Sequence, residues 1–299
     1  MKIRMLILAF VVLLAGCAHH QQKTDVLKPA QSMLWSMEKD GVKIFLLGSI
    51  HAANEDMYPL TTSLYTAYDE SDTIGVEIDI LNIDQAALQK LIMETGMYKE
   101  GDNIENHISP ETVDKTKKAL LGLELPYGPM KVYKPWMIGV AISQVKISKS
   151  GMDPSLGIDL HFLQKAVGDK KKIVELEGSE FQIGLFSGLS DKEQEDFLLS
   201  TLMSDDTTED VLKRLRHAWK TGDLELLGNI VEESVKDFPE LKDFYDKLIG
   251  KRNVNMKNTM IEFASEGGKF FFIVGAAHLI GEDGIIALME KEGFTSKRQ

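Results

Sequence analysis

The chain has 299 residues, of which 43% are hydrophobic and 27% charged, an ordinary composition for a globular protein of one large or two small domains. Its formal net charge of −12 at pH 7 argues against nucleic acid or anionic lipid as a partner, because both need a basic surface. The only cysteine is Cys17, so no internal disulfide can form and stability must come from the core.

The first residues have the pattern of a bacterial lipoprotein signal. An apolar stretch, residues 5–15, follows two basic residues, and its length of about 11 residues is short of the roughly 20 that a membrane-spanning helix needs. It ends in Leu14-Ala15-Gly16-Cys17, which resembles the lipobox of such signals. We expect residues 1–16 to be a signal peptide, Cys17 to carry lipid, and residues 17–33 to be a flexible tether.

The residue after the cysteine bears on the destination of the protein. It is Ala18 and not an aspartate, and in lipoproteins this favours transfer to the outer membrane over retention at the inner one. We therefore expect a protein of the cell envelope, anchored by lipid to the outer membrane and facing the periplasm. An ordinary cleaved signal with an incidental cysteine is the alternative.

The folded part opens with alternating strand and helix patterns. Two apolar runs, residues 34–38 and 42–47, flank a Lys39-Asp40-Gly41 turn and predict a β-hairpin. Helical spacing follows over residues 59–68, and a buried strand over residues 73–78. The second hairpin strand, the helix and this strand predict a parallel pair with a right-handed crossover.

The middle of the chain is rich in helix signals. Ser109-Pro110-Glu111 predicts a helix start, and residues 190–193 form a capping box. Residues 206–221 predict a helix that ends at a glycine, and residues 241–264 predict a long one. A single strand, residues 172–176, is expected between these helices.

One pattern occurs both near the start and near the end of the chain. The segments IFLLGSIH (residues 44–51) and FFIVGAAH (residues 271–278) each consist of an apolar strand, a glycine, two small or apolar residues and a histidine. Ligands of open α/β sheets bind beyond the carboxyl ends of the strands, where Gly48 and Gly275 would let the backbone turn sharply or approach a ligand closely.

The two histidines of this pattern are the first candidates for a metal site. His51 and His278 would meet if their strands are neighbours, and the strand over residues 73–78 would bring Glu77 and Asp79 to the same face. Two imidazoles and a carboxylate suit Zn²⁺ or Mn²⁺, with coordination positions left for water or substrate.

Structural roles remain open for several polar residues. Glu77 could cap a neighbouring helix, and Asp159, at a helix start, could satisfy free backbone amides. Glu177 closes a strand and is also a candidate for the site. We expect His107 in a loop, and His217 on a solvated helix face with its arginine neighbours.

Three familiar hydrolase types are excluded. The chain has no Gly-x-Ser-x-Gly elbow and no His-Glu-x-x-His motif, which removes the serine-hydrolase and common zinc-protease mechanisms. Its only cysteine is assigned to lipid attachment, so a thiol nucleophile is removed as well.

Six motifs, in order, resemble the TraB/GumN family, also called TraB/PrgY, to which the animal TIKI proteins are related. The resemblance covers about residues 34–294. It implies a single EreA/ChaN-like α/β domain over residues 34–299, with a central mixed, largely parallel sheet flanked by helices and a helical insertion at about residues 100–265. The motifs are FLLGSIHAANEDMYPL, VEID with Glu77, Gly157-Ile158-Asp159, Val174 to Glu177 with Gln182, Arg252-Asn253 with Met256, and Gly275 to Leu279 with the glycines after it.

The family resemblance implies a metal-dependent hydrolase. The animal branch looks like a metalloprotease acting on secreted signalling proteins, and the bacterial branch includes proteins that inactivate peptide pheromones. Carried over by position, His51, Glu77 and His278 are the metal-ligand candidates, with Arg252 and Asn253 as polar groups facing the site.

The mechanism expected from this resemblance starts from a Zn²⁺ or Mn²⁺ ion that lowers the pKa of a bound water. Glu77 or Glu177 would be the general base, and Arg252 would stabilise an oxyanion or hold a carboxylate terminus. We expect a peptidase for extracytoplasmic peptides or proteins. The alternative is a non-catalytic lipoprotein that binds a peptide or a small ligand, haem included, in the same crevice.

Overall fold

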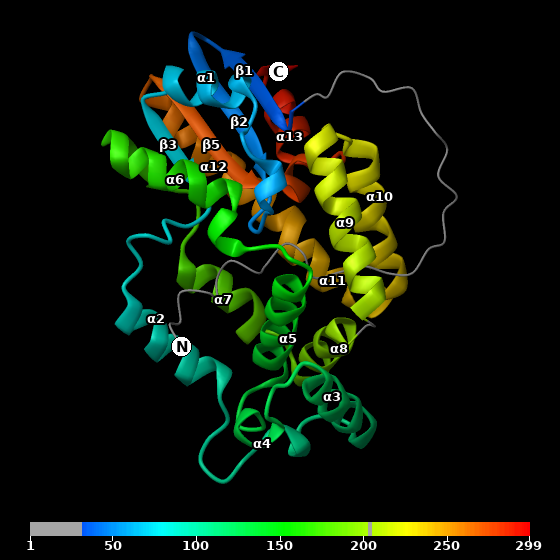
Figure 1. The fold of residues 1–299 in the computed structure, drawn as a ribbon. Coiled ribbons are helices and arrows are strands. Elements are labelled where there is room, and N and C mark those ends of the chain that lie inside the picture. Colours follow the sequence, from blue (N-terminus) through cyan, green and yellow to red (C-terminus); the bar gives the residue numbers. More distant parts are fainter. Residues whose placement is uncertain (1–31, 203–204) are drawn as a thin grey trace, which may run out of the picture.

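One mixed sheet organises the computed structural model, which describes residues 32–202 and 205–299 (Figure 1). The predicted signal peptide and the predicted lipid site, Cys17, lie outside the described residues. Within the described part, no helix is long and apolar enough to cross a membrane. The strands are β1 (Leu34–Lys39), β2 (Val42–Ser49), β3 (Thr73–Val76), β4 (Lys172–Glu175), β5 (Lys269–Gly275) and β6 (Thr295–Arg298).

The strand order is β4-β3-β5-β2-β1-β6. Neighbours from β4 to β2 are parallel, whereas β1 pairs antiparallel with both β2 and β6. The predicted hairpin is confirmed: Asp40 and Gly41 both have positive φ, as a tight turn between two right-twisted strands requires. The predicted α/β class with a mixed, largely parallel sheet is confirmed, whereas edge strand β6 was not predicted.

The predicted pairing of the first two parallel strands is wrong. β2 and β3 run in the same direction, but β5 lies between them and pairs with both. The reason is that β5 has apolar side chains on both faces and is buried along nearly its whole length, so it belongs at the centre of the sheet. This insertion places the carboxyl ends of β3, β5 and β2 side by side.

Helices cover both faces of the sheet, as Figure 1 shows. Along β5, Phe271 and Ile273 pack into the core of one face, whereas Phe270 and Phe272 pack into the core of the other, because side chains alternate along a strand. The first face carries α1 (Thr62–Glu70) and α6 (Ile158–Asp169), and the second carries α12 (Arg252–Ser265) and α13 (Ile285–Lys291).

Most of the other helices form a lobe below the sheet in Figure 1. Its aromatic core includes Trp136, Phe186, Phe197 and Phe244. Two stretches of chain build this lobe, because α6 and β4 return to the sheet between them. The helices of the lobe are α2 (Gln85–Gly96), α3 (Pro110–Gly122), α4 (Tyr127–Met130), α5 (Pro135–Lys149), α7 (Ser179–Ser187), α8 (Asp191–Thr201) and α11 (Lys242–Tyr245). The remaining two helices, α9 (Asp205–Thr221) and α10 (Leu224–Asp237), form a hairpin along the side of the sheet.

Capping signals located the starts of two of these helices correctly. Ser109 caps α3 by accepting the N–H of Thr112, and Ser190 forms the predicted capping box of α8 with Glu193. The predicted helix end at Gly222 is also confirmed, with a φ of 66° there.

The long helix predicted over residues 241–264 is confirmed as one continuous helical stretch, but a π-helical turn interrupts its α-helical geometry. α11 is followed by a π-helical turn, Asp246–Lys251, and α12 begins at Arg252. A π turn holds one residue more than an α turn and changes the direction of the side chains that follow. Here it lets Phe244 pack in the lobe while Arg252 turns toward the sheet.

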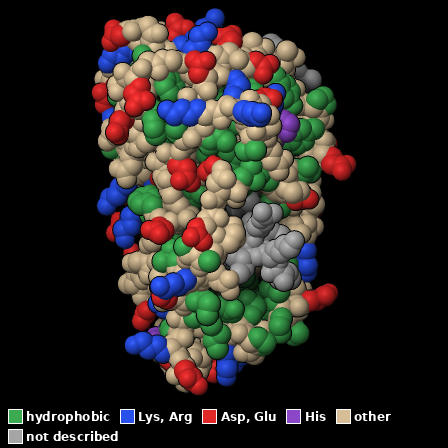
Figure 2. All heavy atoms as spheres, turned by 90° about the vertical axis from the view of Figure 1, so that its left-hand side faces the viewer, with side chains coloured by type: hydrophobic (Ala, Val, Ile, Leu, Met, Phe, Trp, Pro, Cys, Tyr) green, Lys and Arg blue, Asp and Glu red, His purple; other side chains and the backbone are tan. Residues whose placement is uncertain are grey.

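The face of the molecule on the left of Figure 1 mixes charge types. Acidic and basic side chains are interspersed over its upper half, and apolar side chains gather in its lower half (Figure 2). Two large apolar side chains, Leu81 and Phe181, are exposed on the segments that follow β3 and β4.

Candidate active site

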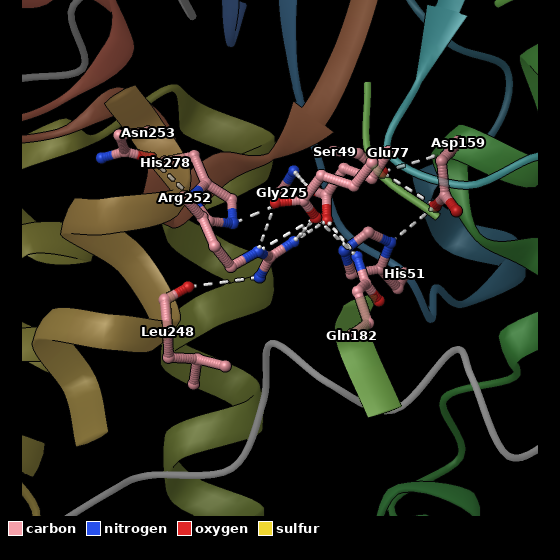
Figure 3. A network of polar contacts seen from close by, with 11 residues as sticks. Ser49, His51, Glu77, Asp159, Gln182, Leu248, Arg252, Asn253, Gly275 and His278 are labelled. Atoms are coloured by element: carbon pink, nitrogen blue, oxygen red, sulfur yellow. Dashed lines mark hydrogen bonds and ion pairs between the residues drawn. The ribbon is translucent and has the colours of Figure 1, made fainter. Parts of the chain in front are cut away.

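A buried ion-pair network lies where the carboxyl ends of the central strands meet α12 (Figure 3). Arg252 is only 1% exposed, and its Nη2 contacts Oε2 of both Glu77 and Glu177, at 2.7 Å in the second case. Its Nε also donates to Glu177. The Gln182 amide donates to both carboxylates, at 3.1 Å and 3.0 Å. These four side chains hold one another in place.

Glu77 is the centre of this network. Burial alone would raise the pKa of Glu77, but the Arg252 guanidinium beside it holds that pKa well below its usual range. The second oxygen, Oε1, accepts the N–H of Gly275 at 2.6 Å, which joins the end of β3 to the end of β5. Glu77 is therefore an ionised carboxylate in a fixed orientation.

His278 lies immediately after β5 in the short helical turn Ala276–Leu279 and is fully buried. Its Nδ1 is 2.6 Å from Oδ1 of Asn253. The amide of Asn253 is oriented by its Nδ2, which donates to the carbonyl of Asp283 at 2.8 Å. Because Asn253 Oδ1 can only accept, Nδ1 of His278 carries the proton and Nε2 carries a lone pair.

This Nε2 faces an acceptor and not a donor. It is 3.8 Å from Oε1 of Glu77, is buried, and has no hydrogen-bond partner among the described residues. Burial, and then the charge of Arg252, lowers the pKa of His278 to about 3, so the ring is neutral at pH 7. A neutral nitrogen lone pair and a carboxylate oxygen thus face each other in the interior, which is an unfavourable contact unless a cation or proton joins them.

His51, in the loop after β2, is oriented in a corresponding way. Its Nδ1 lies 3.2 Å from Oδ1 of Asp159, in the first turn of α6. Ser49 orients the carboxylate, since its hydroxyl donates to Asp159 Oδ1 at 2.9 Å. Burial would lower the pKa of His51, but Asp159 outweighs it and raises the pKa to about 9. The side chains of His51 and Asp159 are 12% and 18% exposed, so this is the most open side of the site.

Two glycines allow the close approaches that build the site. A Cβ on Gly157 would lie 2.6 Å from the carbonyl oxygen of His51, so only glycine lets the start of α6 dock on this loop. A Cβ on Gly48 would lie 2.7 Å from Cδ1 of Leu279, in the loop that carries His278. The two loops with the Gly-x-x-His pattern therefore contact each other.

The structure gathers most of the residues proposed from the sequence. His51, Glu77 and His278 lie at the ends of three strands that are neighbours in the sheet, and Arg252, Asn253, Glu177 and Asp159 contact them. Asp79 is not with them, because β3 ends at Val76 and the Asp79 carboxylate binds Asn82 in a local turn.

Two contributors were missed by sequence reasoning. Ser49 and Gln182 were given no role, although Gln182 belongs to one of the six motifs and Ser49 precedes His51 by two positions. The available signals were the position of Ser49 two residues before His51 and the membership of Gln182 in a family motif.

The candidate ligands suit a divalent metal in chemistry and orientation. Both imidazoles have Nδ1 held by a side-chain oxygen, the arrangement found around metal-bound histidines, and Glu77 Oε1 keeps a lone pair beside the N–H it accepts. Within residues 32–202 and 205–299, however, no three His, Cys, Asp or Glu side chains are grouped closely enough to hold a metal ion. His278 and Glu77 face each other, and His51 stands outside that pair.

Two other histidines, His107 and His161, have local side-chain partners. His107 stacks on Tyr98 with ring centroids 4.2 Å apart and contacts Asp102 at 2.8 Å. His161 contacts the hydroxyl of Tyr65 at 3.1 Å. They serve as controls for the two histidines of the site.

Comparison with known proteins gives distant relatives. An uncharacterized protein of Escherichia coli, YbaP, is 27% identical over 79% of this chain and 84% of its own length. The Metalloprotease TIKI1 of Xenopus tropicalis is 22% identical over 94% of this chain and 63% of its own length. An uncharacterized protein of Treponema pallidum is 19% identical over 87% of the chain and 81% of its own length. No solved structure matches.

A family model covers nearly the whole described chain. It matches residues 33–298, which include both Gly-x-x-His loops, the buried carboxylates and the arginine between them. The chain belongs to the TraB/PrgY/gumN family.

Proposed function

We propose that this protein is a metal-dependent hydrolase that cleaves peptides or proteins in the cell envelope. The observation that carries the proposal is the buried Nε2 of His278, whose lone pair faces Glu77 across 3.8 Å and has no donor from residues 32–202 or 205–299. A metal ion satisfies both groups, whereas a structural histidine in the core would be expected to have a hydrogen-bond partner at each nitrogen.

His51, Glu77 and His278 would hold the ion, with Zn²⁺ and Mn²⁺ as the candidates. Such an ion lowers the pKa of a bound water to about 7 and polarises a carbonyl group. The similarity to a protein named Metalloprotease TIKI1 supports this chemistry.

The neighbouring side chains orient these candidates. Asp159 and Asn253 fix the imidazoles of His51 and His278 by accepting from Nδ1. Arg252 keeps Glu77 ionised and oriented, and because its guanidinium is buried between two carboxylates we assign it to positioning rather than to contact with an oxyanion. Glu177 is held on Arg252 in the same way, which makes it a poor general base.

A substrate would approach on the side of His51 and Asp159, the most exposed pair of the site. The exposed Leu81 and Phe181 follow β3 and β4, and Phe181 is adjacent to Gln182 of the network. They offer apolar contact to the side chains of a peptide. Lipid on Cys17 would hold the domain at the outer membrane, in reach of periplasmic peptides.

The experiment is metal analysis combined with a peptide-cleavage assay on the purified protein. We expect about one equivalent of bound zinc or manganese, and cleavage that a chelator stops and the metal restores. His51→Ala and His278→Ala should lose both, while His107→Ala and His161→Ala keep them.

Two results would go against this function. If a folded His278→Ala variant kept all of its metal, the metal ion would not be bound at the proposed site. A wild-type protein that binds peptides without metal and without cleaving them would favour the non-catalytic alternative.

A further inference from the structure

One face of α9 is fastened to the loop that carries His51. Positions 216, 219 and 220 share a face of the helix. Trp219 contacts the end of β2, just before this loop, and Arg216 and Lys220 contact the loop itself. The contacted positions lie before and after His51 in the chain, so the helix spans the start of the loop. The contacts are Trp219 Nε1 to the Gly48 carbonyl at 2.7 Å, Arg216 Nη1 to Asn54 Oδ1 at 3.1 Å, and Lys220 Nζ to Asp56 Oδ2 at 3.1 Å.

The helix paired with α9 packs on the other histidine loop. Leu227 of α10 lies in the same apolar cluster as Ala276 and Leu279, which flank His278. Leu279 in turn contacts the backbone of Gly48. The hairpin α9–α10 therefore packs against both loops, close to where they touch. In Figure 1 it runs along the side of the sheet and down to the helical lobe.

The helix face around His217 was expected to be solvated, and the structure corrects this in part. His217 is exposed, but its neighbour Arg216 contacts the His51 loop. Arg214 has a different partner: it pairs with Glu233 of α10 at 2.8 Å, within the hairpin. Arg216 thus docks the hairpin on the loop, whereas Arg214 holds the two helices of the hairpin together.

We infer that Trp219 is a positioning residue of the candidate active site. Its indole N–H holds the Gly48 carbonyl, three residues before His51, and so sets the His51 loop against the loop that carries His278. This inference rests on the proposed function. The hairpin would set the distance between His51 and His278, and that distance matters because both are proposed metal ligands.

The test compares two tryptophan variants. Trp219→Phe keeps an aromatic ring but loses the N–H that the Gly48 carbonyl accepts. Trp136→Phe makes the same change in the helical lobe, at a buried indole whose N–H has no partner among the described residues. Hydrogen exchange should rise over residues 48–54 and 276–280 in the first variant only. Zinc affinity should fall about tenfold there, and the absorption spectrum of bound Co²⁺ should change.

A second pair covers the case in which Trp219→Phe fails to fold. Arg216→Ala removes a hairpin-to-loop contact, and Arg214→Ala removes an ion pair inside the hairpin. Exchange should rise over residues 48–54 in Arg216→Ala and stay at the wild-type level in Arg214→Ala.

Three outcomes decide the inference. Unchanged exchange in the His51 loop of both Trp219→Phe and Arg216→Ala overturns it. The inference is also overturned if Trp219→Phe raises hydrogen exchange in both loops but keeps the zinc affinity of the wild type. If the wild-type protein binds no zinc, manganese or cobalt, the proposed function fails, and exchange alone then decides whether Trp219 holds the two loops.

Discussion

At the scale of single residues, His278 is defined by what its two nitrogens contact. Asn253 accepts from Nδ1 and is itself held by the carbonyl of Asp283, so the tautomer is set by a chain of fixed groups. This leaves Nε2 with its lone pair directed at Glu77. For metal binding, the contact between His278 and Asn253 matters as much as the histidine itself. Without it, the ring could rotate or change tautomer and direct an N–H at the Glu77 carboxylate.

Replacing Asn253 should therefore weaken metal binding without removing a ligand. In Asn253→Ala, the ring of His278 loses its acceptor, and zinc affinity should fall about 10- to 100-fold, the range for partners that orient a ligand. The matched control is Asn258→Ala, an exposed asparagine on the same helix. Competition against a chromophoric chelator measures both, and equal affinities in the two variants would contradict this role of Asn253.

Arg252 should matter for stability. Arg252→Met leaves Glu77 and Glu177 buried and unpaired, which should lower the free energy of unfolding by about 3–5 kcal/mol. Adding Glu177→Gln removes one of the two uncompensated charges and should restore part of the loss. Urea denaturation of the single and double variants measures this, and a double variant no more stable than the single one would rule out charge as the cause.

At the scale of the elements, α6 is docked by its first residues. The N–H of Ile158 donates to the carbonyl of Ile50 at 3.0 Å, and Gly157 lets the backbones approach this closely. The helix start thus brings Asp159 to His51. Gly157 is therefore needed at the start of α6 because any side chain there would collide with the His51 loop.

Two glycines of α6 allow a matched comparison. Gly157→Ala would push a methyl group against the His51 carbonyl, and we expect a loss of about 1–3 kcal/mol in unfolding free energy. In Gly168→Ala the added methyl group meets nothing within 4 Å, and the helix should gain about 0.5–1 kcal/mol. Thermal or urea unfolding distinguishes them. Equal stability of the two variants would remove the close contact from the account.

Local sequence patterns predicted the helices and strands correctly more often than they predicted which of these elements lie side by side in the fold. The Asp-Gly turn, the caps at Ser109 and Ser190 and the strand ending at Gly275 depend on a few adjacent residues, and all were predicted. The position of β5 between β2 and β3 depends on segments about 200 residues apart, and no local period encodes it. The π turn before Arg252 could not be predicted either, because its sequence is equally compatible with a regular α-helix.

The site shows the same division. The repeated Gly-x-x-His pattern identified both histidine loops, and the family resemblance added Arg252 and Asn253. The partners that orient them could not be assigned from the sequence, because Ser49, Gln182 and Trp219 act through three-dimensional contacts with ordinary side-chain types. Asp79 was expected on the same face as Glu77, which is wrong, because the strand was expected to continue past Val76.

At the scale of the whole molecule, a catalytic domain would be held at a membrane by its N-terminus. The domain has a net negative charge and mixed charges on the face seen in Figure 2, so lipid on Cys17 is the expected anchor rather than a basic surface. Replacing Cys17 by serine should move the protein from the membrane fraction to the soluble fraction and abolish labelling by palmitate.

The control for that experiment is the next residue. Ala18→Asp should keep the lipid but hold the protein at the inner membrane, which density-gradient separation of the two membranes detects. Palmitate labelling that persists in Cys17→Ser would show that the anchor lies elsewhere.

The proposed function requires a metal ion that joins His278 to Glu77. Crystals of the zinc- or manganese-loaded protein, with diffraction recorded on both sides of the metal absorption edge, test it most directly. We expect one anomalous peak within about 2.0–2.3 Å of His278 Nε2 and of a Glu77 oxygen, with His51 as the third protein ligand. A loaded crystal in which His278 Nε2 has no metal beside it, and the only peaks lie at other side chains, would contradict it.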